Sequence, residues 1–179
     1  MVHPAFGPFL FDTSAESWIA RSQSSAVRAW FAEYLSLHQV HVSAITVMER
    51  IRGYALMARR AKGRVREMVE AEQHAYLNEL GHVQPVDAAA ATIAAEIMAL
   101  LPQPPTPPRH AHKMAESRQE RLVRWRFDCI IAATALATEM VLIHNNPADF
   151  ESIRSAIETS PERFPKLGPL GLIRCESLV

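Results

Sequence analysis

The sequence predicts an α/β protein in which helices cover both faces of a parallel central sheet. Short apolar runs that are typical of buried strands alternate along the chain with longer stretches of helical pattern. Residues 128–137 form a run that is apolar on nearly every face of a helix, so this helix is expected to pack against a sheet. Alternation of strands and helices favours parallel pairing, because each crossover helix returns the chain to the same edge.

The first half of the chain starts with an apolar run at residues 8–11, which predicts a buried strand that ends at Asp12. Polar and apolar residues then alternate at 39–43, as in a second strand. Gly81 is placed to end the last helix of this half as its C′ residue. The helices expected between these points cover 14–20, 24–37 with Val27, Trp30, Phe31, Tyr34 and Leu35 on one face, a stretch from 44 past Gly53, and a stretch up to Leu80.

The second half is predicted to hold strands at 82–86, 140–144 and, at the sheet edge, 172–174. Asp87 is expected to cap a helix that ends at Leu101, because the prolines that follow cannot continue it. With 179 residues, the chain is expected to form a single domain over 1–179. Residues at about 102–126 are then a proline-rich and basic insertion within that domain.

The composition excludes several classes of protein. Nineteen basic and nineteen acidic residues cancel, so local charge alone can indicate a nucleic-acid partner. The N-terminus lacks the pattern of a signal peptide, and no window approaches 18 apolar residues, so no membrane contact is expected. Cys129 and Cys175 stand apart without a C-x-x-C motif, which favours reduced thiols in a cytoplasmic protein.

Three acidic residues are expected to meet at one edge of the sheet. Asp12, Glu49 and Asp128 each follow a strand or begin a helix, and such junctions converge in a parallel sheet. Convergent carboxylates suit Mg²⁺ or Mn²⁺, which hold phosphate oxygens and lower the pKa of an attacking water. The pattern therefore indicates a metal-dependent enzyme that cuts phosphodiesters.

Each acidic residue also has a simpler interpretation. Thr46 and Glu49 have the spacing of a capping box. Asp128, together with Asp87 and Asp149, has the position of a helix cap, and Asp12 could simply begin a turn. A carboxylate directly after a buried strand, as at Asp12, is nevertheless costly unless something compensates it.

Four segments resemble sequence motifs of one family. They are FDTS at residues 11–14, SAITVMER at 43–50, DCIIAATA at 128–135 and HNNPADF at 144–150. In this order they are similar to the motifs of the PIN-domain nucleases, especially the VapC-like toxins of toxin–antitoxin systems. The resemblance covers nearly the whole chain and implies a PIN-like fold.

The resemblance also implies a function and a set of site residues. The function would be that of a divalent-metal-dependent endoribonuclease, a hydrolase, with a small antitoxin covering the cleft and a homodimer as the usual assembly. The metal ligands and catalytic residues would be Asp12, Glu49, Asp128 and Asp149. Supporting positions would be Thr13, His144 and Asn146.

Three residues depart from the motifs of the family. His144 stands where a Thr or Ser hydroxyl is usual, Asn146 where some relatives have Asp, and Arg50 where Leu is common. An imidazole can donate a hydrogen bond as a hydroxyl does, but it is bulkier and can carry charge. The alternative is therefore a catalytically weak or inactive scaffold that binds RNA or protein.

Arginines are concentrated at 50–66 and again at 109–126. Arginine suits bidentate contact with phosphate, and the second stretch leads directly to Asp128. The predicted contacts to an RNA backbone are Arg52, Arg121, Arg124 and Arg126. The alternative for the first stretch is a solvated helix face paired with Glu67, Glu70 and Glu72.

Overall fold

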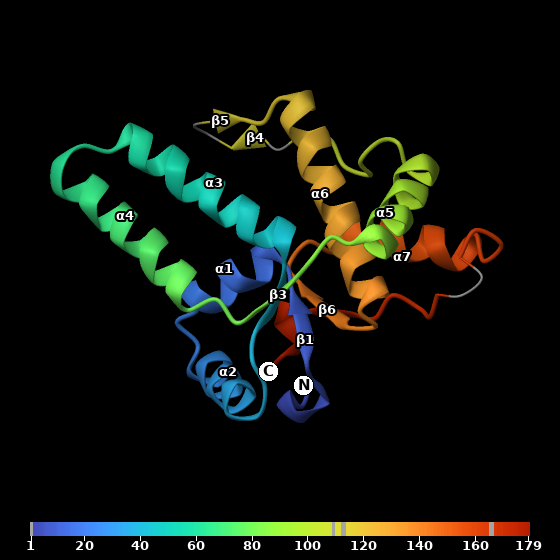
Figure 1. Ribbon diagram of the computed structural model, residues 1–179, viewed down its shortest axis with the longest axis horizontal. Helices are drawn as coiled ribbons and strands as arrows, with labels where there is room; N and C mark the ends of the chain where they lie inside the picture. Colours follow the sequence, from blue (N-terminus) through green and yellow to red (C-terminus); the bar gives the residue numbers. More distant parts are fainter. Residues whose placement is uncertain (1, 109, 112–113, 165–166) are drawn as a thin grey trace.

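The computed structural model describes residues 2–108, 110–111, 114–164 and 167–179. Its centre is a five-stranded sheet in which every neighbouring pair is parallel, in the order β3-β2-β1-β6-β7 (Figure 1). The strands are β1 (Phe9–Phe11), β2 (His41–Ser43), β3 (His82–Gln84), β6 (Val141–His144) and β7 (Leu172–Arg174). The predicted α/β class with a parallel sheet is confirmed, including the edge strand at 172–174.

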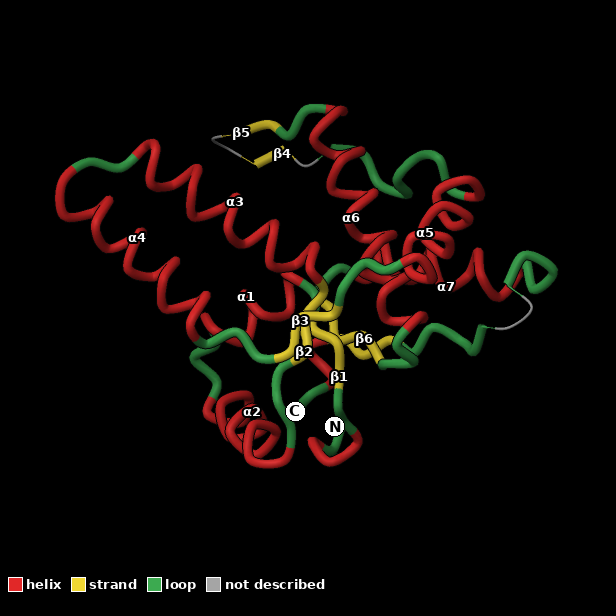
Figure 2. The backbone as a smooth tube through the Cα atoms, viewed as in Figure 1, coloured by secondary structure: helices red, strands yellow, loops and turns green. Residues whose placement is uncertain are grey.

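Helices surround the short strands, which gather at the centre of the molecule (Figure 2). The helices are α1 (Thr13–Arg21), α2 (Ser25–Leu37), α3 (Ala44–Arg60), α4 (Gly63–Asn78), α5 (Ala88–Leu100), α6 (Arg118–Ala137) and α7 (Pro147–Thr159). Two short 3-10 helices, η1 (Pro4–Phe6) and η2 (Cys175–Ser177), lie near the termini, and a small hairpin pairs β4 (His110–Ala111) with β5 (Met114–Ala115). None of the helices described is long and apolar enough to cross a membrane.

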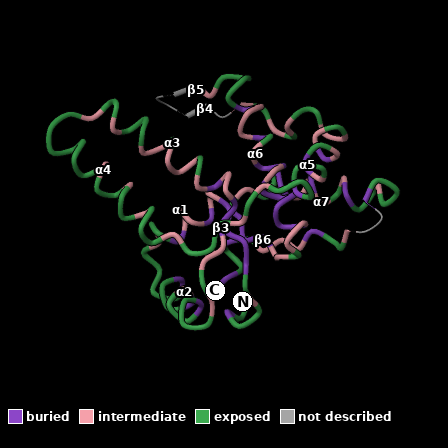
Figure 3. The backbone as a smooth tube through the Cα atoms, in the orientation of Figure 1, coloured by how far each residue is buried: buried purple, intermediate pink, exposed green. Residues whose placement is uncertain are grey.

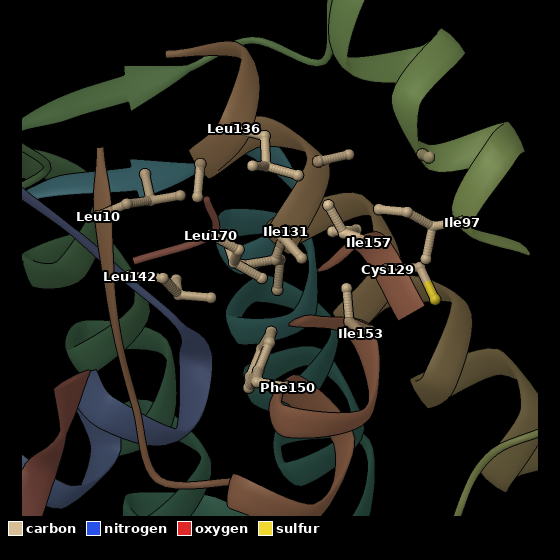
Figure 4. Packing of buried hydrophobic residues seen from close by; sticks show 14 of the residues in the cluster. Leu10, Ile97, Cys129, Ile131, Leu136, Leu142, Phe150, Ile153, Ile157 and Leu170 are labelled. Carbon is tan, nitrogen blue, oxygen red and sulfur yellow. The ribbon is translucent and has the colours of Figure 1, made fainter. Parts of the chain in front are cut away.

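The two faces of the sheet carry separate apolar cores, because neighbouring side chains along a strand point to opposite faces. Leu10 and Leu142 pack with residues of α5, α6 and α7, among them Ile97, Ile131 and Phe150 (Figure 4). The other core joins strands β1, β2 and β6 to helices α1, α2 and η2. Its buried members are Phe9, Phe11, Ala15, Ile19, Trp30, Tyr34, Val42, Ile143, Cys175 and Leu178.

The α3–α4 hairpin extends away from both cores, and most of its residues are exposed or half-buried (Figure 3). On α2, which Ser24 caps, Val27, Trp30 and Tyr34 are buried. The expectation that Leu35 shares this buried face is wrong, since half of its surface is exposed. Cys129 and Cys175 are both buried free thiols.

The prediction that Asp128 begins a helix is wrong. Helix α6 begins ten residues earlier, at Arg118, where Ser117 and Glu120 form a reciprocal capping box. No glycine or proline interrupts residues 118–137, so the basic stretch and the apolar run form one helix. Asp128 therefore lies inside α6. Of the predicted insertion, Arg109, His112 and Lys113 lie outside the described residues.

Gly81 has a different role from the one predicted. Helix α4 ends at Asn78 with Glu79 as its C-cap, so Gly81 is not the C′ residue. It lies where β3 approaches β2, and a Cβ atom on it would be 2.2 Å from the carbonyl oxygen of Val40. That oxygen accepts a hydrogen bond of 2.8 Å from the backbone N–H of His82. Close approach of two backbones is what requires glycine here.

We expect Gly81→Ala to destabilise the protein by about 1 to 3 kcal/mol, because the added methyl group forces β2 and β3 apart. Gly53→Ala is the matched control. A Cβ at Gly53 meets nothing within 4 Å, so alanine should stabilise α3 slightly. Urea unfolding of the three proteins measures both effects, and equal stability of Gly81→Ala and wild type would contradict the packing argument.

Candidate functional site

An open cleft of about 520 Å³ lies at the carboxyl edge of the sheet, where β1 and β6 end. Asp12 enters it directly after β1, Glu49 from α3, and Asp128 from α6. The predicted convergence of these three carboxylates is therefore observed, although Asp128 comes from inside a helix. The remaining lining residues are Thr13, Ser14, Ser17, Trp18, Arg21, Ser22, Arg124, Asn145 and Asn146.

Asp12 is both a helix cap and a residue of the cleft. Its Oδ1 accepts a hydrogen bond of 2.6 Å from the backbone N–H of Ala15, which caps α1. Ser14 Oγ donates to both carboxylate oxygens, at 2.9 and 2.7 Å. Burial nevertheless raises the pKa of Asp12 to about 6, against the opposing effect of these hydrogen bonds, and the charge of Glu49 adds to the rise. Asp12 therefore caps α1 and also lines the cleft.

Glu49 is not part of a capping box. The N-cap of α3 is Ser43, whose Oγ accepts from the backbone N–H of Ile45 at 3.3 Å. Thr46 is fully buried within the helix. Glu49 instead accepts a hydrogen bond from Thr13 Oγ1, and burial raises the pKa of its carboxyl. The predicted supporting residue Thr13 thus holds the side chain of Glu49.

Asp128 cannot act as a cap, because the N–H groups around it are already bonded within α6. Only 7% of its surface is exposed. Asn146 Nδ2 donates to its Oδ2 at 3.2 Å. Burial, a hydrogen bond with Asp149 and the charges of Asp149, Asp12 and Glu49 raise the pKa of Asp128 well above its usual range. The site therefore favours uptake of either a proton or a cation.

Asp149, predicted as a fourth ligand, is fully buried in the first turn of α7 and is not among the residues that line the cleft. Its Oδ1 accepts from Arg121 Nη2 at 2.6 Å and its Oδ2 from Asn146 Nδ2 at 2.8 Å. Arg124 Nη1 lies 3.7 Å from Oδ2. The N-cap of α7 is Asn146, so Asp149 is not a cap either.

His144 lies behind the cleft at the end of β6. It is fully buried against Phe150, with ring centroids 5.0 Å apart. Its Nδ1 accepts from the backbone N–H of Asn146 at 3.3 Å, while Nε2 is buried without a partner among the described residues. Burial lowers the pKa of His144 to about 4, so the ring is neutral at pH 7. It supports the loop that carries Asn146 and adds no charge to the site.

The predicted RNA contacts differ in exposure. Arg52 and Arg126 are exposed, and Arg124 is half-buried at the cleft, where two of its nitrogens each lie 2.9 Å from an oxygen of Glu116. The prediction for Arg121 is wrong for this structure, because only 1% of its surface is exposed. Seven residues, or two helical turns, separate it from Asp128, so it lies on the inner face of α6.

Arg50, the residue that departs from the family motif, lies between two tyrosines of the α3–α4 hairpin. Its guanidinium carbon is 5.4 Å from the ring centroid of Tyr54 and 5.1 Å from that of Tyr76. It also donates to Ser17 Oγ at 3.1 Å and lies 3.9 Å from Glu16. Burial raises the pKa of Glu16 to about 7, and the nearby charge of Arg50 opposes this rise. An arginine here ties α1 to the hairpin.

Sequence reasoning missed several residues of the cleft. Ser14 bonds Asp12 and also accepts at 3.0 Å from the backbone N–H of Asn145, so it links the ends of β1 and β6. Its place in the FDTS motif was the available signal. Trp18 and Arg21 follow one and two helical turns later on α1, where no motif distinguished them.

The donor set suits a hard divalent cation. Three carboxylates with raised pKa values line one cleft, and a cation would relieve both their burial and their mutual repulsion. In the arrangement described, no three His, Cys, Asp or Glu side chains of the described residues stand close enough to hold a metal ion. Side-chain rotation at Asp12, Glu49 or Asp128 would be required to complete such a group.

Comparison with known proteins gave a family match and several structural neighbours. The family model of the PIN domain matches residues 9–155. The fold is similar to that of VapBC2 from Rickettsia felis, in a structure with a DNA fragment from the promoter. The two chains are 15% identical, the match covers 93% of this chain and 97% of that chain, and the TM-score is 0.58. The fold is also similar to DNA-bound VapBC from Salmonella typhimurium, with 21% identity, 93% and 97% coverage, and a TM-score of 0.56.

A third neighbour is FitAcB from Neisseria gonorrhoeae, which is 25% identical over 82% of this chain and 93% of that chain, with a TM-score of 0.54. No curated protein matched the chain. The first two likenesses concern the fold, and the family match spans most of the chain, including every carboxylate described above.

The raised pKa of Asp12 predicts how the stability of the metal-free protein depends on pH. An acid whose pKa is higher in the folded state stabilises the fold least when it is ionised, so stability falls as pH rises from about 4 through about 6. A rise from 3.8 to about 6 corresponds to about 3 kcal/mol. Asp12→Asn should lack this component while still capping α1.

Urea unfolding of both proteins in chelator at pH 4 and pH 7 measures the effect. The difference between them isolates Asp12 from other groups that titrate in this range, such as Glu16 and His144. If the stabilities of wild type and variant changed equally with pH, the pKa of Asp12 would not be raised in the folded state.

Proposed function

The chain belongs to the PIN-domain family, and on this premise we propose that it is a divalent-metal-dependent endoribonuclease acting in the cytoplasm as the toxin of a toxin–antitoxin pair. One observation carries the proposal. Asp12, Glu49 and Asp128, which lie far apart in the sequence, line one open cleft and all have raised pKa values. Such a cluster is costly without a cation, and functional sites are where such costs concentrate.

Asp12, Glu49 and Asp128 would hold Mg²⁺ or Mn²⁺. Such an ion, when bound, would lower the pKa of an attacking water and neutralise charge on the phosphate. The chain's own groups orient these ligands. Ser14 Oγ and the N–H of Ala15 hold Asp12, and Thr13 Oγ1 holds Glu49. Thr13, Ser14 and Ala15 all belong to the first turn of α1, so one rigid element positions two of the three carboxylates.

Arginines near the acidic cluster support a polyanionic substrate. Arg124 lines the cleft, and the charges of Arg124 and Arg52 both oppose the rise in the pKa of Glu49. Arg126 is exposed further along α6. Guanidinium groups beside the acidic cluster can contact the phosphates on either side of the bond that is cut.

The partner we propose is a small antitoxin that covers the cleft. The structural neighbours include VapBC and FitAB, both in structures with bound DNA, and this likeness supports such a partner. A second and larger groove, of about 860 Å³, lies between α1–α2 and the α3–α4 hairpin and shares Arg21 with the cleft. An antitoxin segment in this groove would meet the edge of the cleft at Arg21. A homodimer is proposed on the family resemblance.

A competing candidate is an inactive PIN scaffold that binds RNA or protein. One observation favours it: the amide nitrogen of Asn146, rather than a carboxylate or hydroxyl, faces Asp128 and occupies one of its oxygens. His144, where the family has a hydroxyl, does not reach the acidic cluster with a hydrogen bond among those of the described residues. Measurement of cleavage and of binding on the same RNAs separates the two candidates.

We expect the purified protein to cleave RNA only when a divalent metal is present. Asp12→Asn, Glu49→Gln and Asp128→Asn should each reduce the rate by more than about 100-fold, because each removes a charged oxygen ligand. The measurement is cleavage of a panel of structured RNAs with Mn²⁺ and with chelator. Asp87→Asn is the matched control, since Asp87 caps α5 and lies outside the cleft.

Two results would reject the enzymatic assignment. One is cleavage by the wild type in chelator. The other is RNA binding without cleavage in Mn²⁺ by a correctly folded wild type, which would favour the inactive scaffold.

RNA affinity should fall steeply with salt, because arginines that contact phosphates release counterions. Replacing Arg52, Arg124 and Arg126 together by Ala should reduce the slope of log affinity against log salt by up to about 2 for single-stranded RNA. Arg66→Ala is the control, because Arg66 lies on α4 in an ion pair of 2.7 Å with Glu70. An unchanged slope in the triple variant would mean that these side chains are only a solvated surface.

A further inference from the structure

Arg121 is a fully buried cation that makes three hydrogen bonds. Its Nη2 donates to Asp149 Oδ1 at 2.6 Å and to Thr106 Oγ1 at 2.9 Å. Its Nε donates to the carbonyl oxygen of Thr106 at 3.1 Å. Only 1% of Arg121 is exposed, and Asp149 is fully buried as well. A buried ion pair of this kind is costly to break from either side, since the remaining charge loses its partner.

The pair continues towards the cleft through the amide of Asn146, while Asp149 also acts on Asp128 directly. Asn146 Nδ2 donates both to Asp149 Oδ2, at 2.8 Å, and to Asp128 Oδ2, at 3.2 Å. Both oxygens of Asp149 are therefore engaged, and the residue does not line the cleft. Thr106, Arg121, Asp149, Asn146 and Asp128 form one continuous chain of contacts, which we call the Arg121 relay.

We propose that Arg121 is a positioning residue of the metal site: it holds Asp149 as the acceptor of Asn146, and Asn146 in turn fixes the orientation of Asp128. In this inference, which rests on the proposed function, Asp149 is an anchor behind the site and not a direct ligand of the cation. The assignment replaces both roles suggested by sequence, namely RNA contact for Arg121 and metal binding for Asp149.

The position of Arg121 in the fold supports this role. Arg121 and Asp128 lie two turns apart on α6 and point to the same side, with Asp149 of α7 packed against both. The proline-rich segment contributes through Thr106, whose neighbour Pro107 has a fixed φ angle and so limits movement of the acceptor. Outer groups that orient metal ligands in this way typically change metal affinity by about 10-fold to 100-fold when removed.

Two other roles would explain the same contacts. Arg121 could simply join the proline-rich segment to α6, in which case its loss would lower stability without affecting the site. Alternatively, Asp149 could rotate to bind the cation directly, in which case its own loss could not be compensated elsewhere. Direct measurement of Mn²⁺ binding separates all three roles, because it does not depend on catalysis.

The experiment measures the Mn²⁺ dissociation constant by calorimetry and the melting temperature in chelator, at one fixed pH. The proteins are wild type, Arg121→Met, Arg121→Lys, Asp149→Asn, and the double variant Arg121→Met with Asp149→Asn. Arg118→Met is the matched control, since Arg118 is an exposed arginine at the start of the same helix.

We expect Arg121→Met to weaken Mn²⁺ affinity by about 10-fold to 100-fold and Arg121→Lys to recover part of the loss, with no change in Arg118→Met. Asp149→Asn should also weaken affinity, because Arg121 attracts the oxygen of the introduced amide and turns its NH₂ group towards Asn146. The double variant should recover affinity, because without Arg121 the amide oxygen can accept from Asn146 and no buried charge lacks a partner.

Three results would overturn the inference. Unchanged Mn²⁺ affinity in Arg121→Met, with only a lower melting temperature, would make Arg121 purely structural. A double variant as weak as Asp149→Asn would make Asp149 a direct ligand, and this comparison decides the question alone if Arg121→Met does not fold. A wild type that does not bind Mn²⁺ would overturn the proposed function itself, and the inference with it.

Discussion

Burial of three carboxylates in one cleft is the constraint on which the rest of this structure depends. A parallel sheet brings the ends of β1, β2 and β6 to one edge, and Asp12, Glu49 and Asp128 line an open cleft there. Burial and mutual charge make this arrangement unfavourable without a proton or a cation. The surrounding hydrogen bonds hold these carboxylates in place despite that cost.

Two separate sets of donors hold the cluster. The first turn of α1 supplies Thr13 and Ser14 for Glu49 and Asp12, so the motif after β1 holds two carboxylates and also caps its own helix. Asn146 serves Asp128, and behind it Arg121 neutralises Asp149. Arg121 itself is buried and does not line the cleft. Among the described residues, the arginines that line it are Arg21 and Arg124.

The departures from the family motifs have structural explanations. Arg50 lies between Tyr54 and Tyr76, so the side chain that departs from the motif is a cation held on two aromatic rings. His144 is neutral and supports the backbone of Asn146 through Nδ1. Neither residue adds charge to the acidic cluster. The altered last motif therefore changes how the loop is supported, while the three carboxylates remain in the cleft.

The sequence by itself determined the parallel α/β architecture, the order of strands and helices along the chain, and the convergence of Asp12, Glu49 and Asp128, because local periodicity and strand-end positions carry that information. It could not place the start of α6, since the capping box at Ser117 looked like part of a basic insertion. It also could not distinguish a buried arginine from an exposed one: Arg121 and Arg126 are alike as letters, and only packing of α6 against α7 and Thr106 decides which one faces Asp149. Burial of a charge depends on partners that are distant in sequence, so tertiary structure alone decided that Asp149 has a cation behind it.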